Sequence, residues 1–190
     1  MSMEEARRAL IERQGTGARY DAANAPRDML LQVRRRTSAF ARVLNDTPDD
    51  GLRLPGDAPE ASGAFQVAKI ALEARQMSLF CAALREGAVP PTLDPKSEDL
   101  RNALTLPPRA LRHLFDHTAV HLNVEWRDLG AANWDSLVEC DPGGPLAVQS
   151  LPDLRDRSLE AALNAMQAVA RSARSEAGGG ITFRKRLRQA

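Results

Sequence analysis

Apolar residues recur at helical spacing in four long stretches of this chain. Pro26 begins the first stretch, because proline is tolerated in the first turn of a helix. Ser62 is a candidate cap for the second, and the glycines 178–180 are expected to end the fourth. The pattern predicts helices over residues 26–45, 62–85, 109–130 and 152–177.

Segments rich in proline and glycine separate these stretches. Residues 45–61 are expected to form a loop, and residues 88–106 a long connection with a short helix at 97–104. Residues 136–149 place short apolar runs on either side of a turn at Asp141-Pro142-Gly143-Gly144, which predicts a small hairpin. The expected fold is therefore an all-α four-helix bundle with long loops and a β-hairpin before the last helix.

The two ends of the chain are expected to lie outside this bundle. Ser2 and Glu5 have the spacing of a capping box, which predicts a short helix to about Arg13. The residues after the last helix are rich in arginine. These features divide the chain into an N-terminal extension at 1–24, a bundle at 25–176 and a basic tail at 177–190.

Composition narrows the functional classes. The formal net charge is +1, which argues against a polyanion or nucleic-acid binder. No apolar run is long enough to span a bilayer, and the N-terminus lacks the apolar core of a secretory signal, so no membrane partner is expected. Cys81 and Cys140 are the only cysteines, and they lack metal-type spacing. Two free thiols in the cytoplasm are the expectation.

The third stretch holds all three histidines of the chain. His113, His117 and His121 are spaced four residues apart, so on a helix they form one slowly drifting line. Asn123 and Trp126 follow within the next turns. Such a mixture of imidazole, amide and indole groups is typical of a helix that lines a polar pocket. A buried helix whose histidines are satisfied by neighbours explains the pattern equally well.

A charged pair stands in the second stretch, which is apolar on most sides. Lys69 and Glu73 lie one helical turn apart and can form an ion pair. If Lys69 is held among apolar side chains, its pKa is depressed, which suits a base or an amine nucleophile. The alternative is that both side chains reach the solvent at the rim.

Two segments resemble a known enzyme family. ARYDAANAPRDMLLQVRRRTSAFARVLN, near the start of the chain, and LFDHTAVHLNVEWRDL, in the histidine stretch, are similar to the corresponding parts of the maleylpyruvate isomerase family. These are thiol-dependent metalloenzymes with the DinB-like four-helix bundle, and the similarity covers roughly residues 18–170. It implies a divalent metal, usually zinc, and a small organic acid or thiol adduct as substrate.

The chain departs from the family at the metal ligands. Family members carry a histidine in the second helix ahead of an Ala-Arg pair, here Ala74-Arg75, and a glutamate and a histidine four residues apart in the last helix. The matching positions in this chain are Lys69, Ser158 and Ala162. None is a ligand type, and an ammonium group repels a dication, so no zinc is expected there.

Three hypotheses follow from this departure. The protein is a small-molecule enzyme that works without the metal, a non-catalytic relative that binds a ligand or a partner protein, or an enzyme whose metal has moved to the histidine line with Glu73 completing the site. For the first, the candidate catalytic residues are His117, His121, Lys69 and Glu73, with Lys69 supplying the charge of the lost ion. The candidate substrate-binding residues are Asn123, Arg75 and Trp126.

The resemblance also implies cofactor and partners. A thiol cofactor is implied by resemblance alone, since no residue in the chain indicates which thiol. The expected partners are a small organic acid or thiol adduct, and a homodimer is left open. A cavity is expected between the second, third and fourth helices, and its wall should include His117, His121 or Asn123 together with Glu73 or Lys69.

Overall fold

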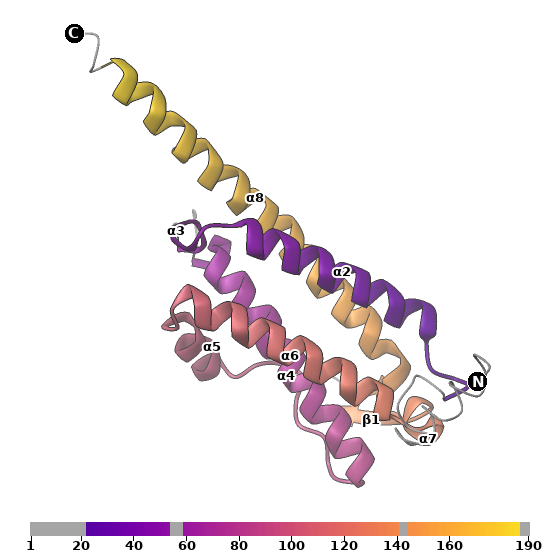
Figure 1. Ribbon diagram of the computed structural model, residues 1–190. Coiled ribbons are helices and arrows are strands. Elements are labelled where there is room, and N and C mark those ends of the chain that lie inside the picture. Colours follow the sequence, from indigo (N-terminus) through magenta and orange to yellow (C-terminus); the bar gives the residue numbers. More distant parts are fainter. Residues whose placement is uncertain (1–21, 54–58, 141–143, 187–190) are drawn as a thin grey trace, which may run out of the picture.

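The computed structural model describes residues 22–53, 59–140 and 144–186, and the four long helices in that part of the chain form a bundle (Figure 1). Each overlaps a helix that the apolar pattern predicts, so the predicted fold class is confirmed. The helices are α2 (Arg27–Asp46), α4 (Gly63–Glu86), α6 (Pro108–Asp128) and α8 (Leu151–Arg186).

Helix α4 is the central element, as its apolar sequence indicates. It packs against both α6 and α8, while α2 packs mainly against α8 and approaches α6 less closely. Its ends follow the sequence signals: the Ser62 hydroxyl accepts a hydrogen bond of 3.2 Å from the Phe65 amide, and Gly87 ends the helix at a φ of 67°. Phe40 of α2 and Phe115 of α6 tie these two helices together, with ring centroids 5.0 Å apart.

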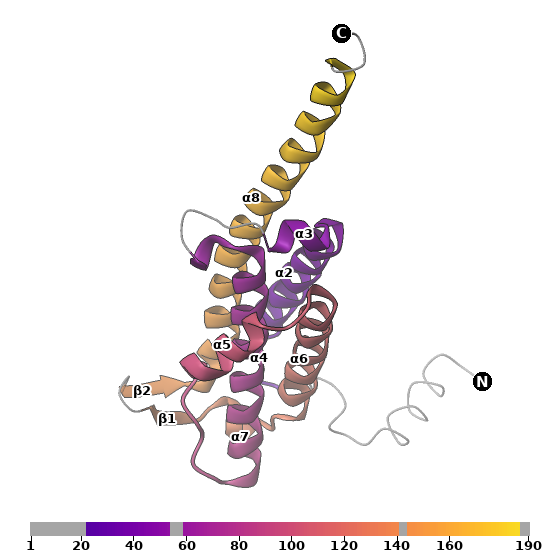
Figure 2. The ribbon, with the colours of Figure 1, turned by 90° about the vertical axis from the view of Figure 1, so that its left-hand side faces the viewer.

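Short elements connect the long helices. Helix α5 (Ser97–Leu104) matches the short helix expected there, and α7 (Ala131–Trp134) follows α6. Strands β1 (Leu137–Cys140) and β2 (Gly144–Ala147) form the predicted antiparallel hairpin, with Leu137 opposite Ala147. Two 3-10 turns, η1 (Pro59–Ala61) and η2 (Val148–Ser150), precede α4 and α8. Figure 2 shows the hairpin near the end of the bundle where α8 begins.

Two predicted boundaries are wrong. The segment 45–61 is not wholly a loop, because α3 (Asp49–Leu52) forms one turn of helix within it. Helix α8 continues through the glycines 178–180 to Arg186, and in Figure 1 its C-terminal half projects beyond the other helices. Glycine lowers helix propensity by about 1 kcal/mol relative to alanine but keeps its amide donor, so it weakens a helix without interrupting its hydrogen bonds.

The expected helix at Ser2–Arg13 and the last four residues lie outside the described residues. The division into extension, bundle and basic tail stays a prediction. No helix in the described part of the chain combines the length and the apolarity that crossing a membrane requires.

Arg112 of α6 caps the C-terminal end of α2. Its guanidinium donates hydrogen bonds to the carbonyl oxygens of Leu44 and Thr47, the latter at 2.8 Å, and to the Asp49 carboxylate at 2.8 Å. The last carbonyl groups of a helix have no partner within the helix and carry partial negative charge. One side chain therefore satisfies these carbonyl groups and fixes α2, α3 and α6 relative to one another.

We expect Arg112→Ala to lower the free energy of unfolding by about 1–3 kcal/mol, because it removes charge-assisted hydrogen bonds to half-buried carbonyl groups. The exposed Arg109, one turn earlier in α6, supplies the matched control: Arg109→Ala should change stability by no more than about 0.5 kcal/mol. Urea unfolding followed by circular dichroism measures both. Equal effects of the two substitutions would contradict the role given to Arg112.

Candidate functional site

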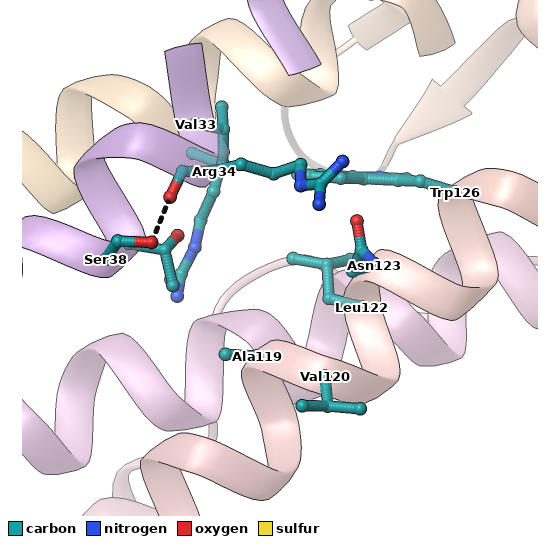
Figure 3. Close-up of a pocket in the computed structure, with 10 residues that line it drawn as sticks. Val33, Arg34, Ser38, Ala119, Val120, Leu122, Asn123 and Trp126 are labelled. Carbon is teal, nitrogen blue, oxygen red and sulfur yellow. Dashed lines mark hydrogen bonds between the residues drawn. The ribbon is translucent and has the colours of Figure 1, made fainter. Parts of the chain in front are cut away.

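One pocket lies between α2 and α6, beyond the contact of Phe40 with Phe115. Its volume is about 220 Å³, and Arg155 of α8 also lines it. Figure 3 shows Arg34 and Ser38 of α2 on one side and Leu122 and Asn123 of α6 on the other. The full lining consists of Val33, Arg34, Thr37, Ser38, Ala119, Val120, Leu122, Asn123, Trp126 and Arg155.

Arg155 brings a positive charge into the interior of the bundle. The residue is 1% exposed, and burial lowers the pKa of its guanidinium to about 10, although the nearby Glu73 carboxylate raises it. Its Nη1 donates a hydrogen bond of 2.8 Å to the carbonyl oxygen of Ile70 and lies 3.7 Å from Oε2 of Glu73. The guanidinium has five donor hydrogens, so the bond to Ile70 uses one of them.

Arg155 was not among the residues predicted from the sequence, although the chain carries a signal for it. Leu151, Arg155 and Leu159 are spaced four residues apart, so the arginine lies on the apolar stripe of α8. All three residues are buried. A charged residue on an apolar stripe is the pattern that indicates a buried, functional or paired charge.

Lys69 occupies a different environment from the one expected. Its side chain is 48% exposed, and its Nζ lies 3.8 Å from the Glu73 carboxylate, whose side chain is 13% exposed. The lysine is therefore at the rim, so the idea of an ammonium enclosed by apolar groups is wrong. Glu73 lies between Lys69 and Arg155, and its Oε2 is buried without a hydrogen bond. The ion pair expected from the sequence is present, but the buried cation beside Glu73 is Arg155.

The histidine line faces a second pocket, between α4 and α6. His117 and His121 line this space of about 380 Å³ together with Arg75, Ser78, Leu79, Leu114 and Thr118. All three histidines of the line are exposed. Neighbouring rings lie close together, with centroids 6.1 Å apart for His113 and His117 and 5.2 Å apart for His117 and His121.

The single cavity expected from the sequence is therefore divided into two. Asn123 and Trp126 line the pocket with Arg155, whereas His117 and His121 line the other, and neither lining includes Lys69 or Glu73. Helical geometry explains the division. At about 100° per residue, Asn123 and Trp126 project from α6 more than about 100° away from the histidine line. Arg75, the third candidate substrate-binding residue, lies on the histidine side.

The positions that the sequence resemblance matches to metal ligands do not fit a divalent ion. Lys69, Ser158 and Ala162 present an ammonium, a hydroxyl and a methyl group, and Ala162 is buried. Among the described residues, no three or more His, Cys, Asp or Glu side chains gather as a metal site would require. Glu73 does not line the histidine pocket, so the structure does not assemble the relocated three-ligand site either.

Residues 34–36 are three consecutive arginines, and Arg34 and Arg36 have separate environments. Arg34 lines the pocket that contains Arg155. Arg36 binds α8 instead: its Nε donates to the buried Asp156 carboxylate at 2.7 Å, and its Nη1 lies 3.1 Å from Glu160. Gln32 donates a further hydrogen bond of 2.6 Å to Asp156. These contacts fix α2 against α8 and leave Arg34 on the pocket side.

Cys81 lies behind the indole of Trp126, within the core. The thiol is fully buried, and its pKa is raised to about 12, mainly by burial and further by the Glu125 carboxylate. The neighbouring Trp126 side chain and the charge of Arg85 act in the opposite direction. A thiol with so high a pKa is a poor nucleophile near neutral pH.

Comparison with known proteins supports the fold. No family model and no curated protein matches the sequence. The chain is similar to the crystal structure of a mycothiol-dependent maleylpyruvate isomerase, with a TM-score of 0.67, 21% identity and coverage of 74% of this chain. A structure of a mutant of a mycothiol-dependent maleylpyruvate isomerase matches equally well, at 20% identity. The match covers 60% of the length of each of these chains. The similarity shows a distant relationship in fold.

We expect Arg155→Met to lower the free energy of unfolding by about 3–5 kcal/mol, because the Glu73 carboxylate then loses its buried counter-charge. Adding Glu73→Gln to the same chain should recover much of this loss, since no unpaired Glu73 carboxylate then remains. Glu73→Gln alone supplies the fourth corner of the double-mutant cycle. Urea unfolding of the four proteins gives the coupling energy, and additive effects would show that the two charges do not interact.

Cys81 should resist thiol reagents in the native protein. In a Cys140→Ser variant, reaction with an aromatic disulfide reagent at pH 8 should be slow without denaturant and complete once the chain unfolds, because burial keeps the thiol protonated and inaccessible. Absorbance of the released thiolate follows the reaction. Rapid reaction of the native Cys140→Ser protein would show that the α4–α6 interface opens readily.

Proposed function

We propose that this protein binds a small carboxylate-bearing molecule in the pocket between α2, α6 and α8. The observation that carries the proposal is the buried Arg155 in the pocket wall. A guanidinium removed from water is costly unless it is paired, and the Glu73 carboxylate at 3.7 Å lies beyond hydrogen-bond length. A carboxylate in the pocket would supply a charge-assisted partner for the remaining donors.

The other pocket residues suit a short organic acid. Val33, Leu122 and Trp126 offer apolar surface for a carbon chain, and Arg34 of α2 places a second cation in the lining. A volume of about 220 Å³ suits a molecule smaller than the drug-sized ligands that fill pockets of about 300–1,000 Å³. Two carboxylates bridging Arg155 and Arg34 would match both the charge and the size. Of the residues expected to bind substrate, Asn123 and Trp126 belong to this site.

Catalysis on the same class of molecule is the second candidate. The similarity to mycothiol-dependent maleylpyruvate isomerases favours it, and a thiol-dependent isomerase or transferase would use a fold of this kind. In that case the substrate would occupy the pocket between α4 and α6, and the acid-base groups would be His117 and His121, on the opposite face of α6 from Arg155. A non-catalytic relative would keep the Arg155 pocket and have no turnover. The cytoplasmic location, the absence of nucleic-acid partners and the homodimer stay predictions.

Binding can be tested on variants that keep the fold. Maleate, fumarate and pyruvate are titrated into ¹⁵N-labelled protein, and the indole N–H signal of Trp126 reports occupancy of the pocket. We expect the double variant Arg155→Met/Glu73→Gln to lower the affinity at least about tenfold, because the charge-assisted hydrogen bonds to the carboxylate are lost. Arg34→Met should lower the affinity for the dicarboxylates maleate and fumarate more than the affinity for pyruvate.

Lys69→Met serves as the control for that titration. It removes a cation that is half-exposed and outside the pocket lining, so binding should be unchanged. Loss of affinity in Lys69→Met with full affinity in the double variant would instead favour Lys69 as the group that replaces the charge of a metal. Unchanged affinity in both variants would refute a site at Arg155.

Turnover separates the enzyme from the binding protein. Incubation with maleylpyruvate and either mycothiol or glutathione, followed by absorbance of the substrate, tests the activity named for the similar structures. If the enzyme hypothesis holds, His117→Gln and His121→Gln should each reduce the rate about 10²–10⁴-fold, as expected for loss of an acid-base group. Tight binding of organic acids without any turnover would support the non-catalytic alternative.

A further inference from the structure

His117 and His121 are not explained by the pocket that contains Arg155. They lie one helical turn apart on α6, are exposed, and have ring centroids 5.2 Å apart. Residues at this spacing project from the same face of a helix and can converge on one ion. A pair of histidines four residues apart is a common half of a zinc site.

We infer that His117 and His121 form a two-histidine site for a first-row transition metal ion, such as Zn²⁺ or Ni²⁺. Imidazole is a ligand that both ions prefer, and two imidazole groups on one rigid helix bind an ion with little loss of conformational freedom. The site differs from the positions of Lys69, Ser158 and Ala162, which lie on α4 and α8. It is also independent of the proposed binding of a carboxylate at Arg155.

The pair at 117 and 121 fits better than the pair at 113 and 117. The rings of His113 and His117 lie further apart, at 6.1 Å, and are nearly parallel, with 26° between their planes. The rings of His117 and His121 lie closer together, at 5.2 Å, with 58° between their planes. Only the second pair lines the pocket between α4 and α6.

Two protein ligands leave coordination positions open. The adjoining hydroxyl groups are already engaged, because Ser78 donates to the Ala74 carbonyl and Thr118 to the Leu114 carbonyl, each at 2.9 Å. The open positions would therefore face water or an added ligand in the space of about 380 Å³. Two protein ligands are fewer than the three of ordinary catalytic zinc sites, so exchangeable ligands would complete the coordination, and Arg75 in the same lining would favour an anion among them.

The test is calorimetric titration of ZnCl₂ and NiCl₂ into full-length protein purified without a histidine tag. We expect one equivalent to bind, with a matching rise in thermal midpoint, because a ligand that binds the native state stabilises it. His117→Gln and His121→Gln should each lower the affinity at least about tenfold, since the loss of even an outer-shell partner costs about 10–100-fold. Because all three histidines are exposed, these substitutions should leave the fold intact.

His113→Gln is the matched control, because it removes a histidine from the same line but outside the pocket. It should change the affinity less than about twofold, well under the tenfold expected for a ligand. An effect of His113→Gln as large as that of His121→Gln would overturn the assignment of the pair. Absence of binding up to about 1 mM metal, the limit of very weak association, would overturn the site itself. Arg155→Met/Glu73→Gln should bind metal like the parent protein, so failure of the organic-acid proposal can be told apart from failure of this one.

Discussion

The bundle depends on keeping one positive charge in its interior. Arg155 is 1% exposed, and its guanidinium is held by the Ile70 carbonyl oxygen and by the field of Glu73. Because an unpaired buried charge costs several kcal/mol, α8 can pack on α4 only where these two groups meet the guanidinium. The same constraint places the guanidinium of Arg155 beside the pocket between α2 and α6. Helix packing and the chemistry of the pocket therefore have one origin.

The division of α6 into two faces that line different pockets follows from helical geometry. Trp126 is buried against Cys81 and lines the Arg155 pocket, while His117 and His121 project to the other side. Rotation of α6 about its axis would not merge the two sets, because both turn together, and it would expose Phe115 and Trp126. Burial of such aromatic side chains contributes about 1.5–3 kcal/mol or more each, so the packing fixes the rotation.

Much of the fold could be predicted from the sequence, because local signals and tertiary packing agree. Ser62 and Gly87 mark helix ends that the structure keeps, and the predicted hairpin forms between β1 and β2. The end of α8 could not be predicted in this way, since glycine weakens a helix without forbidding it. The candidate site was predicted less well. Spacing indicated a Lys69–Glu73 pair, but exposure is set by the packing of α4 against its neighbours, and Lys69 proved half-exposed.

The chain and the maleylpyruvate isomerases with a similar fold suggest two ways of placing positive charge in one scaffold. The metal that the sequence resemblance implies would demand several anionic or imidazole ligands around one point, whereas a guanidinium carries its own charge and its own donors. The partners of Arg155 are a backbone carbonyl oxygen and Glu73, and α4 and α8 carry Lys69 and Ala162 at the positions that the resemblance matches to metal ligands. A fixed guanidinium can bind and orient a carboxylate, but it offers no open coordination position. Chemistry that needs a Lewis acid would therefore require a separate centre, and the histidine face of α6 is the candidate with suitable ligands.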